Sequence, residues 1–379
     1  MAKVVFLLGS GASATFGLPT MVQLTSLIER EFQYVSDVKK ELEELGFTAD
    51  IEAILTVLND AANGYERVIR TMGPSVALIT EKPEKPRFTG KIWERLAKEL
   101  WVVKPIFELG KIKETIWDRC SISENDPKIL KVANFYHNLF EELEKQPYTR
   151  AATEEGSGKL EANINLGNKW VPLDLFTTNY DLLIERMCDS IGIECSRGVK
   201  VEEGAIRREV FDPNAIQSTL ALCLFKLHGS LDFYIVGDEI QRFPAPPKTR
   251  IDAGGRLIRG ELMIYPIHAK YVYSYPYFNM FSQLYEKLAR SAACVIIGHS
   301  MRDEAINDVL TAAMIRNRSL KLVIVNIDPK DVCFLNMENK FISKERIQER
   351  TNLVVEGFGT EKCLSSIIEA LGEDPGITI

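Results

Sequence analysis

Short apolar runs, each followed by a helical pattern, constrain the fold of this chain more than any other feature. The runs are rich in Val, Ile, Leu and Phe, as is typical of strands that are buried on both faces of a parallel sheet. Their alternation with helices predicts an α/β protein with a doubly wound parallel sheet, in which ligands bind beyond the carboxyl ends of the strands. The runs are Val4 to Leu8, Leu173 to Thr177, Cys294 to Gly298, Leu322 to Ile327 and Asn352 to Val355.

Two parts of the chain interrupt this alternation. Residues 50–168 contain helix formers at amphipathic spacing and no comparable apolar run, which predicts a large, mainly helical insertion. Residues 232–276 mix short aromatic segments with Pro and Gly, and we expect a small irregular subdomain of hairpins and loops there. Residues 1–49 and 169–379 then form one Rossmann-like core, which includes the irregular subdomain.

The composition is that of a globular protein and argues against several kinds of partner. The 379 residues are 46% hydrophobic and 26% charged, which is enough for a sizeable core. A net charge of -7 argues against general binding to nucleic acids or anionic lipid, because binding to phosphate needs clustered Lys and Arg. The seven cysteines do not form a disulfide framework, and no apolar run approaches the ~18 residues of a membrane helix. We therefore expect a cytoplasmic protein without a membrane association.

The first loop with candidate chemistry runs from Gly9 to Ser13 and follows the first apolar run directly. Glycines here would let the backbone approach a pyrophosphate closely, and a helical pattern begins shortly afterwards, near Pro19 or Thr20. The third glycine of the dinucleotide-binding pattern is absent, because Ala14 takes its place. A tight turn between a strand and a helix, without a ligand, is the alternative interpretation.

Two further loops carry side chains that suit catalysis. Residues 177–181 end the second run with Asn179 and Asp181, which could act at a site or could cap the following helix. His228 follows another apolar stretch and precedes Gly229. Its imidazole titrates near neutral pH, which suits a general base, although a structural histidine would also fit this position.

The last two loops follow the third and fourth runs. Gly298, His299 and Ser300 close one of them, and Asn326 lies at the end of the other. Small polar residues after parallel strands can contact the ribose or phosphate of a nucleotide, but such loops are common in α/β proteins. Each of the two loops is therefore a weak signal by itself.

Taken in order, the five motifs resemble those of the sirtuin superfamily. The resemblance covers residues 3–19 and, with gaps, residues 173–328, and it leaves the helical insertion unmatched. It implies binding of NAD, with the first loop at the pyrophosphate and with Ser300 and Asn326 at the adenosine ribose. It also implies that Asn179 orders the nucleophile, that Asp181 holds the nicotinamide carboxamide and that His228 is the base at the ribose hydroxyls.

The resemblance thus implies a set of site residues and a chemical requirement. The nicotinamide leaves through an oxocarbenium-like state, so catalysis depends on positioning and charge stabilisation more than on a strong nucleophile. The implied catalytic residues are Asn179, His228 and Asp181. The implied residues that bind NAD are Gly9, Ser10, Gly11, Ala12, Ser13, Pro19, Thr178, Tyr180, Gly298, His299, Ser300 and Asn326.

Three departures from sirtuins change the expected reaction. Sirtuins have four zinc-binding cysteines after the His-Gly motif, whereas no cysteine lies between Leu224 and Ala293 here, so we expect no zinc. Sirtuins continue with Asp-Phe-Arg after the Pro of the first motif, where this chain has Thr20, Met21 and Val22. The helical insertion also replaces surface that admits an acyl-lysine peptide, which makes water the expected acceptor.

This combination resembles the bacterial sirtuin-like NAD hydrolases of antiphage defence. The resemblance implies an NAD hydrolase that depletes cellular NAD, that forms a homo-oligomer and that binds a HerA-type ATPase, the last by analogy of size and family. Three alternatives remain open: a zinc-free deacylase, a mono-ADP-ribosyltransferase, or a module that senses NAD without turning it over.

Overall fold

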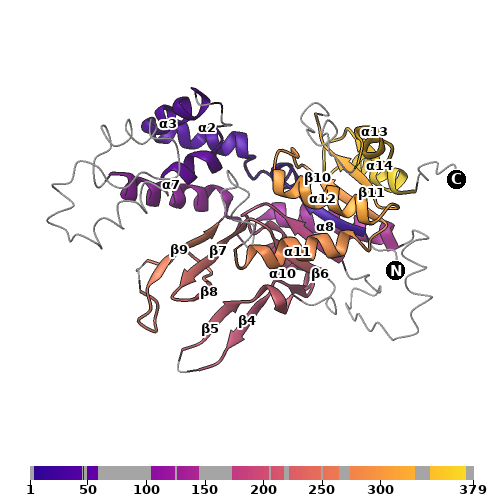
Figure 1. The fold of residues 1–379 in the computed structure, drawn as a ribbon. Coiled ribbons are helices and arrows are strands. Elements are labelled where there is room, and N and C mark those ends of the chain that lie inside the picture. The colour runs from indigo at the N-terminus through magenta and orange to yellow at the C-terminus, as the bar shows by residue number, and fades with distance from the viewer. Residues whose placement is uncertain are drawn as a thin grey trace. The chain divides into compact units, whose positions relative to one another are not determined.

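The structure is a computed structural model that forms two compact units (Figure 1). The residues that it describes are 4–44, 46, 49–58, 104–123, 126–144, 173–204, 206–216, 222–248, 251–263, 274–328 and 342–372. The first unit comprises Met1–Leu18, Ser121–Met263 and Ala269–Ile379, and the second comprises Pro19–Cys120 and Ile264–His268.

A seven-stranded sheet organises the first unit, with the strand order β12-β11-β10-β1-β2-β6-β3. All of its neighbouring strands are parallel, which confirms the predicted doubly wound α/β fold. The five predicted runs all form strands of this sheet, and β6 and β3 extend it beyond β2. The strands are β1 (Val4–Leu8), β2 (Leu173–Thr177), β3 (Cys195–Ser196), β6 (Leu222–Lys226), β10 (Ala293–Ile297), β11 (Lys321–Val325) and β12 (Thr351–Val354).

β1, β2, β6 and β10 are buried along their whole length, which indicates that both faces of this sheet are covered. On one face Val4, Phe6 and Leu8 pack in a core with α8, α10 and α14. Figure 1 shows α11 and α12 side by side in front of the sheet. The helices of this unit are α1 (Ser10–Ala14), α8 (Pro127–Glu144), α10 (Leu183–Ile191), α11 (Tyr277–Leu288), α12 (Glu304–Arg316), α13 (Lys344–Glu349) and α14 (Glu361–Gly372), with a short 3-10 helix at Pro213–Ala215.

The region expected to form a helical insertion contributes to both units. Most of residues 50–168 lie outside the described residues, but α7 (Lys104–Cys120) belongs to the second unit and α8 to the first. Ile129, Val132, Tyr136 and Leu139 on α8 recur at helical spacing and are buried in the core of the sheet. The amphipathic pattern of α8 was visible in the sequence, whereas its packing partner was not.

The first loop itself is helical, which the sequence did not suggest. The short helix α1 begins directly after Gly9, and the expected helix further on is α2 (Met21–Glu31) of the second unit. Thr20 is the N-cap of α2, and it forms a capping box in which Thr20 and Gln23 satisfy each other's backbone N–H groups.

The second unit is helical where the structure describes it. It contains α2, α7 and α3 (Gln33–Glu44), and a further helical segment covers residues 51–58. Glu31 accepts a hydrogen bond from Arg119 at 3.0 Å, which links α2 to α7. Lys39 and Glu29 form an ion pair at 2.9 Å, which links α3 to α2.

The first unit also contains a five-stranded antiparallel sheet, in the order β4-β5-β8-β7-β9. It includes strands from the region expected to form a subdomain at 232–276, and it also includes two strands from before residue 232. Residues 249–250 and 264–273 of that expected subdomain lie outside the described residues. The strands are β4 (Val199–Glu202), β5 (Arg208–Phe211), β7 (Gly229–Val236), β8 (Glu239–Arg242) and β9 (Ile258–Met263).

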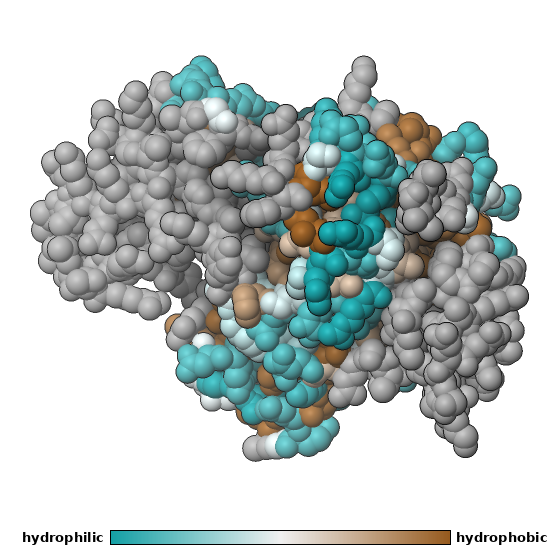
Figure 2. Space-filling model, turned by 45° about the vertical axis from the view of Figure 1, so that its right-hand side comes forward, coloured by the Kyte–Doolittle hydropathy of each residue, from teal (hydrophilic) through white to brown (hydrophobic). Residues whose placement is uncertain are grey.

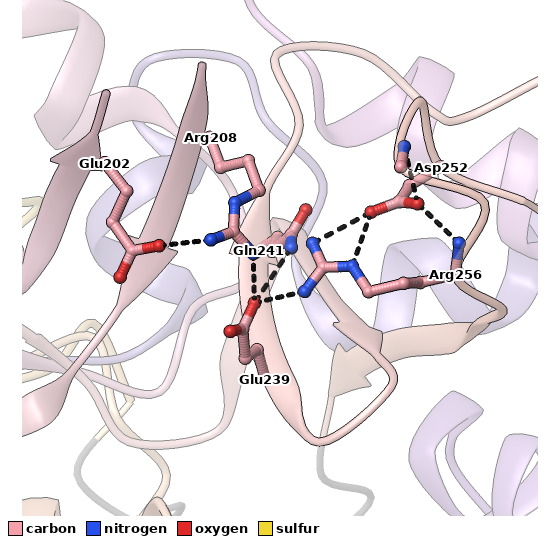
Figure 3. Close-up of polar contacts among 7 residues, drawn as sticks. Glu202, Arg208, Glu239, Gln241, Asp252 and Arg256 are labelled. Atoms are coloured by element: carbon pink, nitrogen blue, oxygen red, sulfur yellow. Dashed lines mark hydrogen bonds and ion pairs between the residues drawn. The ribbon is translucent and has the colours of Figure 1, made fainter. Parts of the chain in front are cut away.

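An ion-pair network on this second sheet joins four of its segments (Figure 3). Glu239 accepts hydrogen bonds from Arg208 at 3.1 Å and from Arg256 at 2.6 Å. The same arginines also bind Glu202 and Asp252. The hydrogen bond from Arg256 contributes most to lowering the pKa of the Glu239 carboxyl. Because these groups are partly exposed, each pair adds little stability, and the network mainly holds the register of the hairpins.

The visible surface of the described part mixes hydrophilic and apolar residues (Figure 2). Large exposed apolar side chains are spread over several elements, for example Val22, Leu130, Phe278 and Ile327. Exposed apolar side chains are normal on protein surfaces. Among the described residues, no helix is both long enough and apolar enough to cross a bilayer.

Candidate functional site

The strand order of the large sheet reverses at β1, and the carboxyl edge there is where a ligand site is expected. β1 lies between β2 and β10. After β1 the chain forms β2, β3 and β6 on one side of it, and later it forms β10, β11 and β12 on the other side. In open α/β sheets, such a reversal of strand order is where ligands bind. The loops that follow β1 and β10 therefore flank the candidate site.

Three glycines pack these two loops against each other. Gly11 donates its N–H to the carbonyl of Gly298 at 2.9 Å, and Gly9 donates to the carbonyl of Ile297 at 2.9 Å. A Cβ on Gly9 would lie 2.6 Å from the Gly298 oxygen, and a Cβ on Gly11 would lie 2.7 Å from its Cα. Both N–H groups form hydrogen bonds within the protein. In this structure the glycines therefore allow the backbones of the two loops to lie close together.

We expect Gly298→Ala to lower the free energy of unfolding by about 3 kcal/mol, through overpacking and a left-handed backbone. Gly298 has a φ of 61°, and a Cβ there would overlap the backbone of Gly11 and Ala12. Gly237 is a matched control, because its φ is 60° and a Cβ there would meet nothing within 4 Å. Gly237→Ala should cost only about 1 kcal/mol. Equal losses in urea denaturation would show that loop packing is unimportant.

Asn179 is fixed against the first loop. Its side-chain Nδ2 donates to the carbonyl of Gly9 at 2.9 Å and to the Ser13 hydroxyl at 3.0 Å, and the residue is buried. The backbone of the loop after β2 also binds the end of β1, because Thr178 donates its N–H to the carbonyl of Leu8 at 3.0 Å. The predicted catalytic amide and the predicted NAD-binding loop are thus in direct contact.

Asp181 lies two residues before the first residue of α10. Its carboxylate accepts a hydrogen bond from the N–H of Leu183 at 3.0 Å, at the start of α10. Asp181 thus binds the first N–H of α10 from the position before its N-cap, Leu182, and the Asn179 side chain binds the first loop instead, so neither residue is the N-cap.

Lys226, which sequence reasoning missed, ties this loop to the next strand. It is the last residue of β6, it is buried, and its ammonium donates to the carbonyls of Tyr180 and Asp181. It also pairs with the buried Glu185 carboxylate at 3.0 Å. Burial raises the pKa of the Glu185 carboxyl, and the charge of Lys226 opposes that shift.

His228 follows β6 and contacts an acidic residue that the sequence analysis did not select. Its Nε2 lies 2.8 Å from Oδ2 of Asp303, and both side chains are largely buried. The other carboxylate oxygen of Asp303 accepts from the N–H groups of Ala305 and Ile306 as the N-cap of α12. An Asp before a helical pattern predicts a cap, but its contact with a residue 75 positions away could not be read from the sequence.

Burial alone would raise the pKa of the Asp303 carboxyl. The hydrogen bond from His228, the electrostatic effects of His228 and His299, and the N–H of Ile306 together outweigh burial. The pKa of Asp303 is therefore lowered, and the carboxyl is an ionised acceptor at neutral pH.

His299 shapes the loop after β10. Its Nδ1 accepts a hydrogen bond from the N–H of Met301 at 3.0 Å, and Asn307 donates to the Met301 carbonyl at 2.8 Å. Met301 has a φ of 58°, which is uncommon for a residue with a side chain and costs of order 1 to 3 kcal/mol. Both polar groups of this strained residue are thus held by side chains.

We expect His299 to make the fold less stable as the pH falls. Burial lowers the pKa of its imidazole to about 4, with Asp303 opposing and His228 adding to the shift. The unfolded chain takes up this proton near its ordinary value of 6.5, so the loss develops as the pH falls from about 6.5 to about 4 and reaches ~3 kcal/mol.

His299→Asn is the matched control, because its Oδ1 can accept from Met301 and does not titrate. Urea denaturation of both proteins, from about pH 7 to about pH 4, measures the difference. Parallel stability curves over this range would contradict the assignment.

The remaining predicted residues occupy different places. Ser300 lies after β10 and Asn326 after β11, at the carboxyl ends of neighbouring strands. The side chain of Asn326 accepts from the N–H of Asp328 at 3.1 Å. Pro19 belongs to the second unit.

Together, the contacts link four loops in a closed circuit. The loop after β2 binds the loop after β1 through Asn179, and Leu227 after β6 donates to the carbonyl of Thr177 at 2.8 Å. His228 reaches Asp303 after β10, and the loop after β10 binds the loop after β1. Because β6 and β10 are three strand spacings apart, roughly 14 Å, these loops must converge above the ends of β1 and β2. Among the described residues, no three His, Cys, Asp or Glu side chains are grouped as metal ligands.

Similar proteins were found by family and by structure. A search of curated proteins found no match. A Sir2 homologue in complex with NAD is 15% identical, with 97% of this chain and 90% of that chain covered and a TM-score of 0.40. A Sir2 homologue mutant in complex with ADP-ribose is 14% identical, with 97% and 91% covered and a TM-score of 0.41. Sir2Tm bound to a propionylated peptide is 12% identical, with 97% and 92% covered and a TM-score of 0.36.

The family comparison falls on the part of the chain that carries most of the site. The loops with Asn179, His228, Asp303 and Asn326 all lie within one continuous stretch of sequence, whereas the loop from Gly9 to Ser13 lies before it. That stretch, residues 174–349, matches the family described as the SIR2-like domain.

Proposed function

We propose that this chain binds NAD at the carboxyl edge of the large sheet and cleaves the bond between nicotinamide and ribose, with water as the acceptor. The observation that carries the proposal is the closed circuit of loops around the ends of β1 and β2, in which Asn179 and His228 follow adjacent strands. The match of residues 174–349 to the SIR2-like domain supports the same conclusion.

In this proposal the two catalytic side chains have different roles: Asn179 orients the nucleophile, and His228 acts as the base. Both bonds that fix Asn179 use its Nδ2, which leaves Oδ1 as the acceptor that would orient a water or hydroxyl nucleophile. The imidazole of His228 would take a proton from a ribose hydroxyl. The buried Asp303 carboxylate lies beside the positive charge that this transfer would create.

The other residues would bind the parts of NAD away from the reacting bond. Residues 9–13 would face the pyrophosphate, Ser300 and Asn326 would contact the adenosine ribose, and Asp181 would hold the carboxamide. The same residues would suit a deacylase or an ADP-ribosyltransferase, which differ from a hydrolase in the acceptor and not in the cleaved bond.

The products of NAD distinguish these reactions. The chain is incubated with NAD in water enriched in the heavy oxygen isotope, with protein in excess so that slow turnover is still detected. We expect nicotinamide and isotope-labelled ADP-ribose in equal amounts, without any peptide. Release of nicotinamide that requires an acyl-lysine peptide, or ADP-ribose attached to protein, would identify a transferase. Binding of NAD without any product would identify a sensing module.

We also propose that the protein acts in the cytoplasm as an effector of antiphage defence that depletes NAD. Following its resemblance to such hydrolases, it would form a homo-oligomer and bind a HerA-type ATPase. Because an unrestrained NAD hydrolase would kill its host, the purified chain should turn over NAD slowly until a partner or a phage signal activates it. Rapid hydrolysis by the chain alone would contradict this restraint.

A further inference from the structure

The contact between His228 and Asp303 constrains which nitrogen of the imidazole carries a proton. A neutral imidazole has one nitrogen that donates and one that accepts. The ionised Asp303 carboxylate can only accept, so Nε2 of His228 must be the donor at 2.8 Å. In this tautomer Nδ1 carries the lone pair.

The orientation of Asp303 is fixed independently of His228. Its Oδ1 accepts from the N–H of Ala305 at 2.9 Å and from the N–H of Ile306 at 3.3 Å at the start of α12. These two bonds direct Oδ2 towards His228. The Tyr180 ring lies 6.4 Å from the His228 ring on another side, and His299 interacts electrostatically with both members of the pair.

We propose that Asp303 is the positioning residue of His228: its carboxylate holds the imidazole with the lone pair on Nδ1 and stabilises the imidazolium formed when Nδ1 takes a proton from a ribose hydroxyl of NAD. The catalytic part of this inference rests on the proposed function. The tautomer does not, because it follows from the contacts of the chain alone.

Asp303→Asn separates the positioning role from the helix cap. Asn and Asp are equally good N-caps, so α12 should keep its start. The cap also fixes the new amide, because only its oxygen can accept from the Ala305 and Ile306 N–H groups. The NH₂ group then faces Nε2 of His228 and donates to it, which moves the imidazole proton to Nδ1 and removes the lone pair that the reaction needs.

The tautomer is measured by long-range nitrogen–proton correlation NMR of protein labelled on histidine, without NAD. The chain has four histidines, and loss of one signal in His228→Gln assigns that residue. His299 is an internal reference, since its Nδ1 accepts from Met301 in both proteins and its proton must stay on Nε2. We expect the proton of His228 on Nε2 in the wild type and on Nδ1 in Asp303→Asn.

Turnover of NAD gives the second readout. We expect Asp303→Asn to lower kcat by about a hundredfold or more, with KM changed by less than about threefold. Asp212→Asn makes the same chemical change at the N-cap of the short helix Pro213–Ala215 and should leave kcat unchanged. A wild-type proton on Nδ1, or a kcat for Asp303→Asn within about threefold of the wild type, would overturn the inference. A wild type that does not cleave NAD would overturn the proposed function instead, while the tautomer would still be decided by the spectrum.

Discussion

Replacing Asn179 by alanine is expected to lower the turnover of NAD at least about a hundredfold while leaving its affinity within a few-fold of the wild type. In the proposed reaction, the amide oxygen orients the nucleophile and contributes little to holding the pyrophosphate or the adenosine. Its loss should therefore appear in kcat more than in KM, which single-turnover kinetics and calorimetric titration with NAD measure separately.

Ser13→Ala is the matched comparison for this variant. It removes one partner of the Asn179 amide, the hydroxyl at 3.0 Å, but keeps Asn179 and its bond to the Gly9 carbonyl. We expect a loss of kcat below about tenfold, because one hydrogen bond is worth about 1 kcal/mol. If Asn179→Ala kept turnover within about threefold of the wild type, Asn179 would have no catalytic role.

Lys226→Met is expected to lower the free energy of unfolding by about 3 to 5 kcal/mol, because it removes the ammonium that pairs with the buried Glu185 carboxylate and leaves only the smaller electrostatic effect of Arg197. Lys226 and Glu185 are 5% and 4% exposed, so water cannot replace the lost partner. Urea denaturation measures this loss.

The double variant Lys226→Met with Glu185→Leu tests the cause. Replacing both members of a buried ion pair by apolar residues of similar size is often nearly neutral, so we expect most of the stability to return. The carbonyls of Tyr180 and Asp181 would still lack the ammonium that holds them. The double variant should therefore fold well and yet show a raised KM for NAD. If Lys226→Met alone were as stable as the wild type, the ion pair of Lys226 and Glu185 would not contribute to stability.

The sequence predicted the large sheet well because parallel strands are buried on both faces. Val4–Leu8 and Leu173–Thr177 form strands with the predicted bounds, since a short, mainly apolar run is buried in the core. It did not predict that α8 packs on this sheet, because amphipathic spacing shows that a helix buries one face but not against what. The antiparallel sheet likewise recruits β4 and β5 through long-range pairing, which no local pattern records.

The candidate site was predictable where a motif is local and unpredictable where it depends on distant contacts. The neighbourhood of Asn179 and His228 follows from their places at the ends of strands, which pattern reasoning can find. Lys226 is a polar residue within an apolar stretch of the sequence, and its partners lie 41 to 46 residues away. The local sequence around Asp303 indicates at most a helix cap. Both contacts are tertiary, so only the fold reveals them.

An experimental structure of the Asn179→Ala variant with NAD tests the central claim most directly, because this variant should bind the dinucleotide without consuming it. We expect NAD to lie along the carboxyl ends of β1, β2, β10 and β11, with its nicotinamide ribose beside His228 and residue 179 and its adenosine ribose beside Ser300 and Asn326. NAD bound away from these loops, or reversed so that its adenosine lies beside His228, would contradict the account.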